Sequence, residues 1–188
     1  MNHKHQLTTR KIVFVALMAA LTTVSSGMRV VLPISIGGNT AFHLGNIFCA
    51  LSGLLLGPWL GGLAAGLGSM LYDMLNPLYI SECWITFLFK GAYGLIAGLI
   101  AWAGSRDWGY GKAVLASAGG AVTYALLYLA KSFYKGIYIK GYTLEAAGLA
   151  VVGKLPATIF NAAVAVIFAP ILAVAIRKAL KKSHLSLD

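Results

Sequence analysis

The sequence predicts an all-α integral membrane protein, a single domain (1–188) built as a bundle of six transmembrane helices. Three observations support this fold class. Hydrophobic residues make up 59% of the 188 residues and charged residues only 11%, whereas a soluble domain is typically about 25% charged. The apolar residues are gathered in long segments. The basic residues stand largely at the chain ends and in short connections, a pattern of membrane topology rather than of nucleic-acid binding, despite a formal net charge of +10.

Six apolar segments are the predicted membrane spans. The first follows Lys4, Arg10 and Lys11, a charge pattern that a secretory signal peptide also shows. Its apolar run is long and no clear cleavage site follows it, so we expect it to remain in the protein as the first helix. The predicted spans cover residues 12–31, 44–57, 60–75, 84–103, 113–134 and 150–176.

The second and third segments are shorter than the roughly 20 residues that a straight span needs. A Gly-Pro turn at 57–58 joins them, so we expect two short helices packed inside the bundle. Gly62 and Gly66 of the third segment share a helical face, and this spacing lets another helix approach closely. Asp73 falls on the same face. It is expected either to face a pocket or to form a structural ion pair with a lysine such as Lys90.

The last three segments are each long enough to cross a bilayer. Each also carries a polar stripe near one end, as judged from the spacing of residues on a helix face. The stripes consist of Thr86 and Lys90 below Trp84 in the fourth segment, Tyr124, Tyr128, Lys131 and Lys135 in the fifth, and Lys154, Thr158 and Asn161 in the sixth.

The distribution of basic residues predicts the orientation in the membrane. Six spans place both termini on one side, and the tails 1–11 and 178–188 are strongly basic, which identifies that side as cytoplasmic. We expect the protein to lie in the plasma membrane. Six cationic residues remain on the outer side or within the outer halves of the spans, and they need another explanation: Arg29, Lys90, Lys131, Lys135, Lys140 and Lys154.

The polar stripes lie at a similar depth on several helices and together predict a pocket that opens outward. An ionisable side chain within a span is costly, and it is therefore a functional candidate by default. The connections 32–43, 76–83 and 135–149 are placed to cover such a pocket. The candidate substrate-binding residues are Lys90, Tyr124, Tyr128, Lys131, Lys154, Asn161, Asp73, Glu82, Trp84 and His43.

These residues also have purely structural interpretations. Lysines near the end of a span extend to lipid headgroups, tyrosines there anchor the interface, and Asn161 suits an interhelical hydrogen bond. Lys140, in the last outer connection, is expected to be solvated. The sequence has no GxxxxGK[ST] phosphate loop and no catalytic or metal-ligand constellation, and Cys49 and Cys83 lack metal spacing. We therefore predict neither an enzyme nor a metal or cofactor site.

Two stretches, FHLGNIFCALSGLLLGPWLGGLAAGLGSMLYDML and FLFKGAYGLIAGLI, resemble the substrate-binding S components of energy-coupling factor (ECF) vitamin transporters. The elements H-L-G, L-L-G-P, G-S-x-x-x-D and F-K-G carry the resemblance together, and it is strongest over 42–100. It is nearest to the riboflavin-type branch, which includes carriers for hydroxymethylpyrimidine and pyridoxine-like compounds.

The resemblance implies six membrane helices, a vitamin site under the loop after the first helix, and a complex with a membrane T subunit and two ATPase subunits. The ATPase activity would then reside in the partners. Members of the family share an A-x-x-x-A motif on the first helix that contacts the T subunit, and Ala16 and Ala20 match it here.

The identity of the vitamin is a separate prediction. Aromatic and hydrogen-bonding residues suit a flat, polar heterocycle, so hydroxymethylpyrimidine is the first choice and a pyridoxine-like vitamin the second. Riboflavin, folate and pantothenate follow. A protein of another class stays open, namely a small membrane assembly or scaffold protein without a ligand, whose polar stripes contact headgroups of the lipid bilayer.

Overall fold

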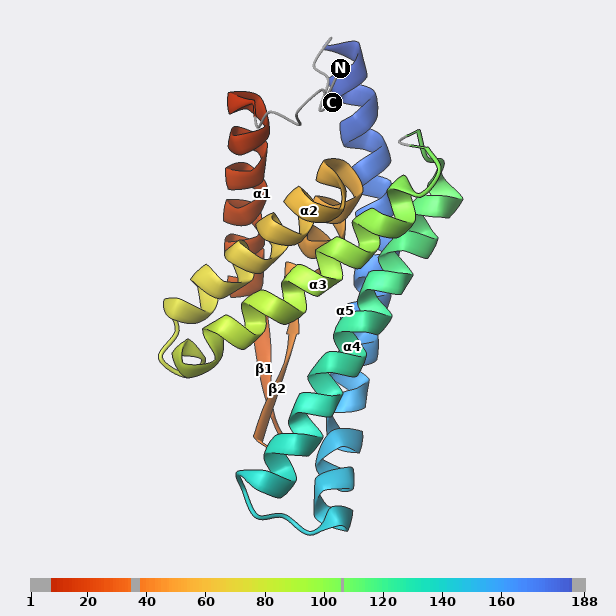
Figure 1. Ribbon diagram of the computed structural model, residues 1–188. Coiled ribbons are helices and arrows are strands. Elements are labelled where there is room, and N and C mark those ends of the chain that lie inside the picture. Colours follow the sequence, from red (N-terminus) through yellow and green to blue (C-terminus); the bar gives the residue numbers. More distant parts are fainter. Residues whose placement is uncertain (1–7, 35–37, 106, 184–188) are drawn as a thin grey trace, which may run out of the picture.

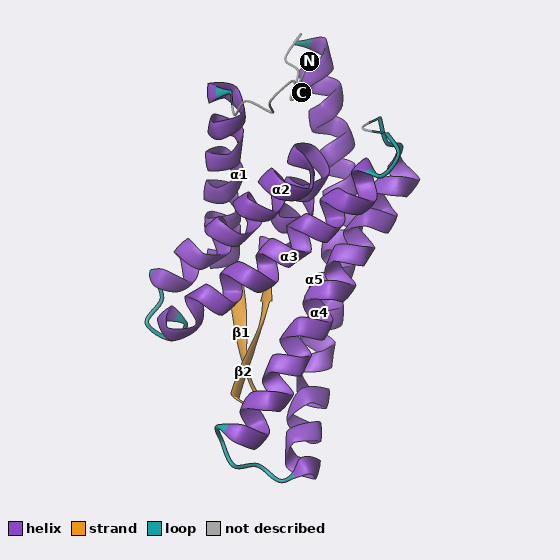
Figure 2. Cartoon of the chain, viewed as in Figure 1, coloured by secondary structure: helices purple, strands orange, loops and turns teal. Residues whose placement is uncertain are grey.

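The computed structural model describes residues 8–34, 38–105 and 107–183. Long helices dominate this part of the chain, and one short β-hairpin follows the first of them (Figures 1 and 2). In chain order, the elements are α1 (Thr9–Gly27), β1 (Arg29–Ile34), β2 (Gly38–His43), α2 (Gly45–Met74), the 3-10 helix η1 (Ile80–Glu82), α3 (Cys83–Trp102), α4 (Tyr110–Tyr138) and α5 (Leu144–Lys182).

Within the described ranges, five helices are long and apolar enough to cross a membrane, judged by length and composition. The prediction of a helical membrane protein is therefore confirmed. The predicted count of six separate helices is not confirmed, because segments 44–57 and 60–75 are joined in the single element α2.

Gly57 breaks α2 into two arms that fold back against each other. Its backbone conformation (φ 77°, ψ −174°) is one that glycine adopts readily and that other residues rarely adopt. Pro58 follows at the start of the second arm, where a proline is tolerated. Cys49 in the first arm and Ser69 in the second meet with 3.7 Å between Sγ and Oγ. The predicted Gly-Pro turn is therefore present, but it lies inside α2 rather than between two separate helices.

Glycines bring both arms of α2 into close contact with α3. A Cβ added to Gly62 or Gly66 would stand 2.9 or 2.8 Å, respectively, from a carbonyl oxygen of α3. Gly53 in the first arm is closer still, since an added Cβ would lie 2.3 Å from the Gly94 carbonyl oxygen. The close helix approach predicted from the Gly62 and Gly66 spacing is confirmed, and α3 is the helix that approaches.

We expect Gly53→Ala to destabilise the fold by roughly 1–3 kcal/mol, because the added methyl group has to displace the backbone of α3. Gly148→Ala in α5 is the matched control, since no atom lies within 4 Å of a Cβ added there and alanine is the better helix former by about 1 kcal/mol. Thermal unfolding in detergent should show a lower Tm for the first variant and an equal or higher Tm for the second. Equal Tm values for the two variants would contradict the packing described here.

Several predicted helix boundaries differ from those of the structure. The first helix ends at Gly27 rather than near residue 31, and the connection predicted over 32–43 belongs mostly to the β-hairpin. The connection predicted over 135–149 is short, because α4 continues to Tyr138 and α5 begins at Leu144.

The arrangement of the elements creates the site. The start of α1 and the end of α5 lie at the same end of the bundle, and the α4–α5 turn lies at the other (Figure 1). The two strands are antiparallel, with Arg29 opposite His43 where the hairpin leaves the helices. The hairpin packs on α5 and also touches α1, which leaves a hollow between it and the helices.

Candidate functional site

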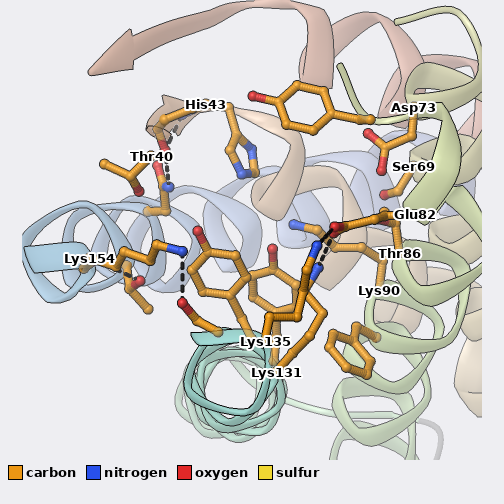
Figure 3. A pocket seen from close by; sticks show the side chains of 18 of the residues that line it. Thr40, His43, Ser69, Asp73, Glu82, Thr86, Lys90, Lys131, Lys135 and Lys154 are labelled. Carbon is orange, nitrogen blue, oxygen red and sulfur yellow. Dashed lines mark hydrogen bonds and ion pairs between the residues drawn. The ribbon is translucent and has the colours of Figure 1, made fainter. Parts of the chain in front are cut away.

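A cavity of about 400 Å³ lies between the β-hairpin and helices α2, α3, α4 and α5 (Figure 3). The cavity brings together nine of the ten residues predicted to bind substrate. Trp84 is the exception: it is 60% exposed and is not part of the lining. The charged residues of the lining are the cationic Arg29, Lys90, Lys131, Lys135, Lys140 and Lys154 and the acidic Asp73 and Glu82.

Lys90 is the most deeply buried cationic residue of the cavity, with only 4% of its surface exposed. Its ammonium group donates a hydrogen bond to Asn46 Oδ1 of α2 and lies 3.9 Å from the centroid of the Tyr124 ring. Tyr124 stacks with Tyr93 on one side and with Tyr128 on the other, at centroid distances of 6.1 and 5.9 Å. One wall of the cavity is therefore flat, aromatic and flanked by a cation, which favours a planar ligand.

Glu82, the last residue of η1, lines the cavity and forms ion pairs with two lysines of α4. Its Oε2 is 2.7 Å from Lys131 Nζ, and its Oε1 accepts a hydrogen bond from Lys135 Nζ. In Figure 3 the two lysine side chains converge on this one carboxylate. Because Lys131 and Lys135 are four residues apart in α4, the helix presents them on one face.

Lys154 reaches the cavity from α5 and is 9% exposed. Its Nζ donates to Ser132 Oγ at 2.7 Å and lies 5.6 Å from the centroid of the Tyr128 ring. The Tyr124–Tyr128 wall therefore has Lys90 near one ring and Lys154 near the other.

Asp73 lines the cavity from the second arm of α2 and is 7% exposed. Thr86 of α3 lines the same cavity. Lys90, the lysine named as a possible ion-pair partner, instead donates to the Asn46 amide. Of the two interpretations of Asp73, the position facing the cavity is the one observed.

Asn161 fastens the hairpin to α5. Its Nδ2 donates to the Ala41 carbonyl oxygen at 2.8 Å, and its Oδ1 accepts from the His43 backbone N–H at 3.0 Å. Phe42 packs edge-on against Phe160 in the same region, at a centroid distance of 4.8 Å. Asn161 lines the cavity, but its side-chain amide is already hydrogen-bonded to the backbone of β2. Its main effect on the site is therefore to hold the β-hairpin over the cavity.

His43 presents a hydrogen-bonding group that the fold leaves unused. Its Nδ1 is buried and has no hydrogen-bond partner among the described residues. Burial, together with the positive charges of Lys90 and Arg29, holds the pKa of His43 well below its usual value. The imidazole is therefore neutral at pH 7 and offers one donor and one acceptor.

Many of the lining residues were not predicted as site residues, and Arg29, Asn46, Tyr72 and Tyr79 are among them. The guanidinium carbon of Arg29 lies 4.1 Å from the Tyr72 ring centroid and 4.9 Å from that of Tyr79. Arg29 did have a signal, since it is one of the six basic residues that the orientation left unexplained. Lys140 lies in the α4–α5 connection and is exposed, as expected, and it also lines the cavity, with its Nζ 5.7 Å from the Tyr142 ring centroid.

Comparisons with known proteins agree with this architecture. A family model described as ECF-type riboflavin transporter, S component, matches residues 6–178. The chain is 31% identical over 114 residues to a protein of Pyrococcus woesei described as an uncharacterised protein in the gap 3′ region, and the alignment covers 61% of this chain and 72% of the relative. The crystal structure of the S component for biotin from an ECF-type ABC transporter is similar in fold, with a TM-score of 0.61, 13% identity, and coverage of 91% of this chain and 94% of that one.

Proposed function

The chain belongs to the family of S components of ECF-type riboflavin transporters, and on that premise we propose that it binds a water-soluble vitamin or vitamin precursor in the cavity under the β-hairpin. The observation that carries the proposal is the stacked Tyr124–Tyr128 wall with a buried lysine near each ring. Such a wall suits a planar heterocycle, and the surrounding polar groups suit its substituents.

Hydroxymethylpyrimidine or a pyridoxine-like compound is the proposed ligand. The neutral His43 imidazole and the Lys90 ammonium offer hydrogen bonds to ring nitrogens and hydroxyl groups. Riboflavin is the second candidate, favoured by the description of the matching family model, and folate and pantothenate follow.

A membrane assembly or scaffold protein without a ligand is the alternative, and thermal stabilisation distinguishes the two. A ligand that binds only the folded state at 100 times its Kd stabilises that state by about 2.7 kcal/mol. We expect one of the named vitamins to raise the Tm of the purified protein in detergent. If the polar residues contact only lipid headgroups, none of the named vitamins will raise the Tm.

We further propose that the protein works in a complex with a membrane T subunit and two ATPase subunits. Ala16 and Ala20 are exposed on α1, whereas Met18 and Ala19 between them are buried against the bundle. An exposed small-xxx-small pair allows a second helix to approach closely. The face of α1 that carries these alanines is the proposed contact with the T subunit.

The proposed topology has six crossings, with each arm of α2 crossing separately and both termini in the cytoplasm of a bacterial cell. A single-cysteine test can use Leu144→Cys and Ser183→Cys in a background without Cys49 and Cys83. Leu144 lies at the start of α5 and is 70% exposed, so a cysteine there is accessible to the label.

We expect a membrane-impermeant maleimide added to intact cells to label Leu144→Cys and to spare Ser183→Cys until the cells are permeabilised. The reverse labelling pattern would contradict the orientation, and with it a cavity that opens outward.

A further inference from the structure

The cavity lining is strongly cationic. Six basic side chains face two carboxylates, so the formal charge of the lining is +4 with His43 neutral. Some basic residues near the end of a span extend to lipid headgroups. That explanation does not fit Lys90 and Lys154, which are 4% and 9% exposed.

Both buried lysines are hydrogen-bonded to neutral groups. Lys90 donates to the Asn46 amide and Lys154 to the Ser132 hydroxyl, and neither forms an ion pair within the described part of the chain. The nearby carboxylates interact with these ammonium groups only through longer-range electrostatics, Asp73 with Lys90 and Glu82 with Lys154. A buried charge is costly unless it is paired, and each ammonium group has three donors, so donors remain for an anion from outside the chain.

Glu82 shows what kind of group this region binds. Its carboxylate is held by Lys131 and Lys135 of α4, although Glu82 itself comes from a one-turn helix between α2 and α3. Lys131 and Lys154 lie 6.0 and 5.6 Å from the centroid of the same Tyr128 ring. An anionic substituent of a ring stacked on Tyr128 therefore lies within reach of both lysines, next to the Glu82 carboxylate.

We propose that the ligand carries an anionic group, a carboxylate or a phosphate, which binds to Lys154 and Lys131, and that Glu82 acts as an internal anion that competes with it. This inference rests on the proposed function of the cavity as a vitamin site. It predicts a preference for the acidic member of any pair of ligands that share a ring but differ in charge.

Titration calorimetry with matched pairs tests the inference on the full-length protein in a neutral detergent and phosphate-free buffer. The pairs are pyridoxine with pyridoxine 5′-phosphate, pyridoxine with 4-pyridoxic acid, hydroxymethylpyrimidine with its phosphate, and riboflavin with riboflavin 5′-phosphate. For the ring that binds, we expect the acidic member to bind at least about tenfold more tightly, a difference of about 1.4 kcal/mol. Lys154→Gln should remove this preference.

Glu82→Gln gives a second, opposite readout, because it removes the competing anion. It should tighten binding of the acidic member by at least about threefold and leave binding of the neutral member unchanged. Glu145→Gln is the matched control, since Glu145 is exposed in the first turn of α5 and does not line the cavity. The Tm of each ligand-free variant checks that it folds.

Neutral members that bind as tightly as acidic ones would overturn the inference and leave the proposed function standing. Weaker binding of the acidic member to Glu82→Gln would also overturn it, because Glu82 would then assist the anion. If no member of any pair binds, the proposed function is wrong and the inference fails with it.

Discussion

Lys90→Met is expected to weaken vitamin binding by about tenfold to 100-fold. Lys90 is buried at the aromatic wall, 3.9 Å from the Tyr124 ring centroid, and its ammonium group is the charged donor nearest to that ring. A hydrogen bond from a charged group is worth about 1.5–3 kcal/mol, and each 1.4 kcal/mol changes the affinity about tenfold. Titration of the purified variant with the vitamin that stabilises the parent protein measures the loss.

The ligand-free stability of Lys90→Met separates loss of binding from loss of folding. Lys90 has no ion-pair partner in the described part of the chain, so methionine removes a buried charge without leaving a carboxylate unpaired. The Tm of the ligand-free variant should therefore be equal to or higher than that of the parent. Lys178→Met, at an exposed position near the end of α5, is the control and should bind normally. Equal affinities of both variants and the parent would mean that Lys90 does not contact the ligand.

The second large effect concerns transport rather than binding. Ala16→Leu and Ala20→Leu add bulk to the exposed face of α1 where close helix approach is proposed. We expect vitamin uptake by cells that contain the complete transporter to fall by at least about tenfold, which corresponds to about 1.4 kcal/mol of lost association free energy. Vitamin binding by the isolated protein should be unchanged, because neither alanine lines the cavity.

Ala163→Leu provides the matched control for these variants. Ala163 is also an exposed alanine, but it lies on α5, so its substitution should leave uptake intact. If Ala16→Leu lost vitamin binding as well as uptake, Ala16 would contribute to packing inside the protein rather than to contact with the T subunit. Normal uptake by Ala16→Leu and Ala20→Leu would show that the partner contacts another face.

Helix periodicity predicted much of the cavity, because it fixes which residues of one helix share a face. Tyr124, Tyr128 and Lys131 are separated by four and three residues, and all three line the cavity. The same rule explains the one residue that was placed wrongly. Trp84 precedes Lys90 by six residues, so the two do not share a helix face, and Trp84 is exposed instead.

The β-hairpin was the principal feature that hydropathy did not reveal. Its first strand (RVVLPI) is apolar enough to extend the predicted first helix, although the β-branched Val30 and Val31 followed by Pro33 are typical of an extended segment. The pairing of Arg29 with His43 and the attachment of the hairpin to Asn161 join residues far apart in the sequence. Contacts of this kind leave no periodic signal within one segment.

Native mass spectrometry of the protein, purified in a mild detergent from cells grown in rich medium, tests the central claim most directly. We predict one bound small molecule of vitamin size with a planar heterocycle. It should be present in the parent protein and in Lys178→Met and depleted in Lys90→Met. A parent protein that carries only lipid or detergent, and that takes up none of the candidate vitamins when they are added, would contradict the account.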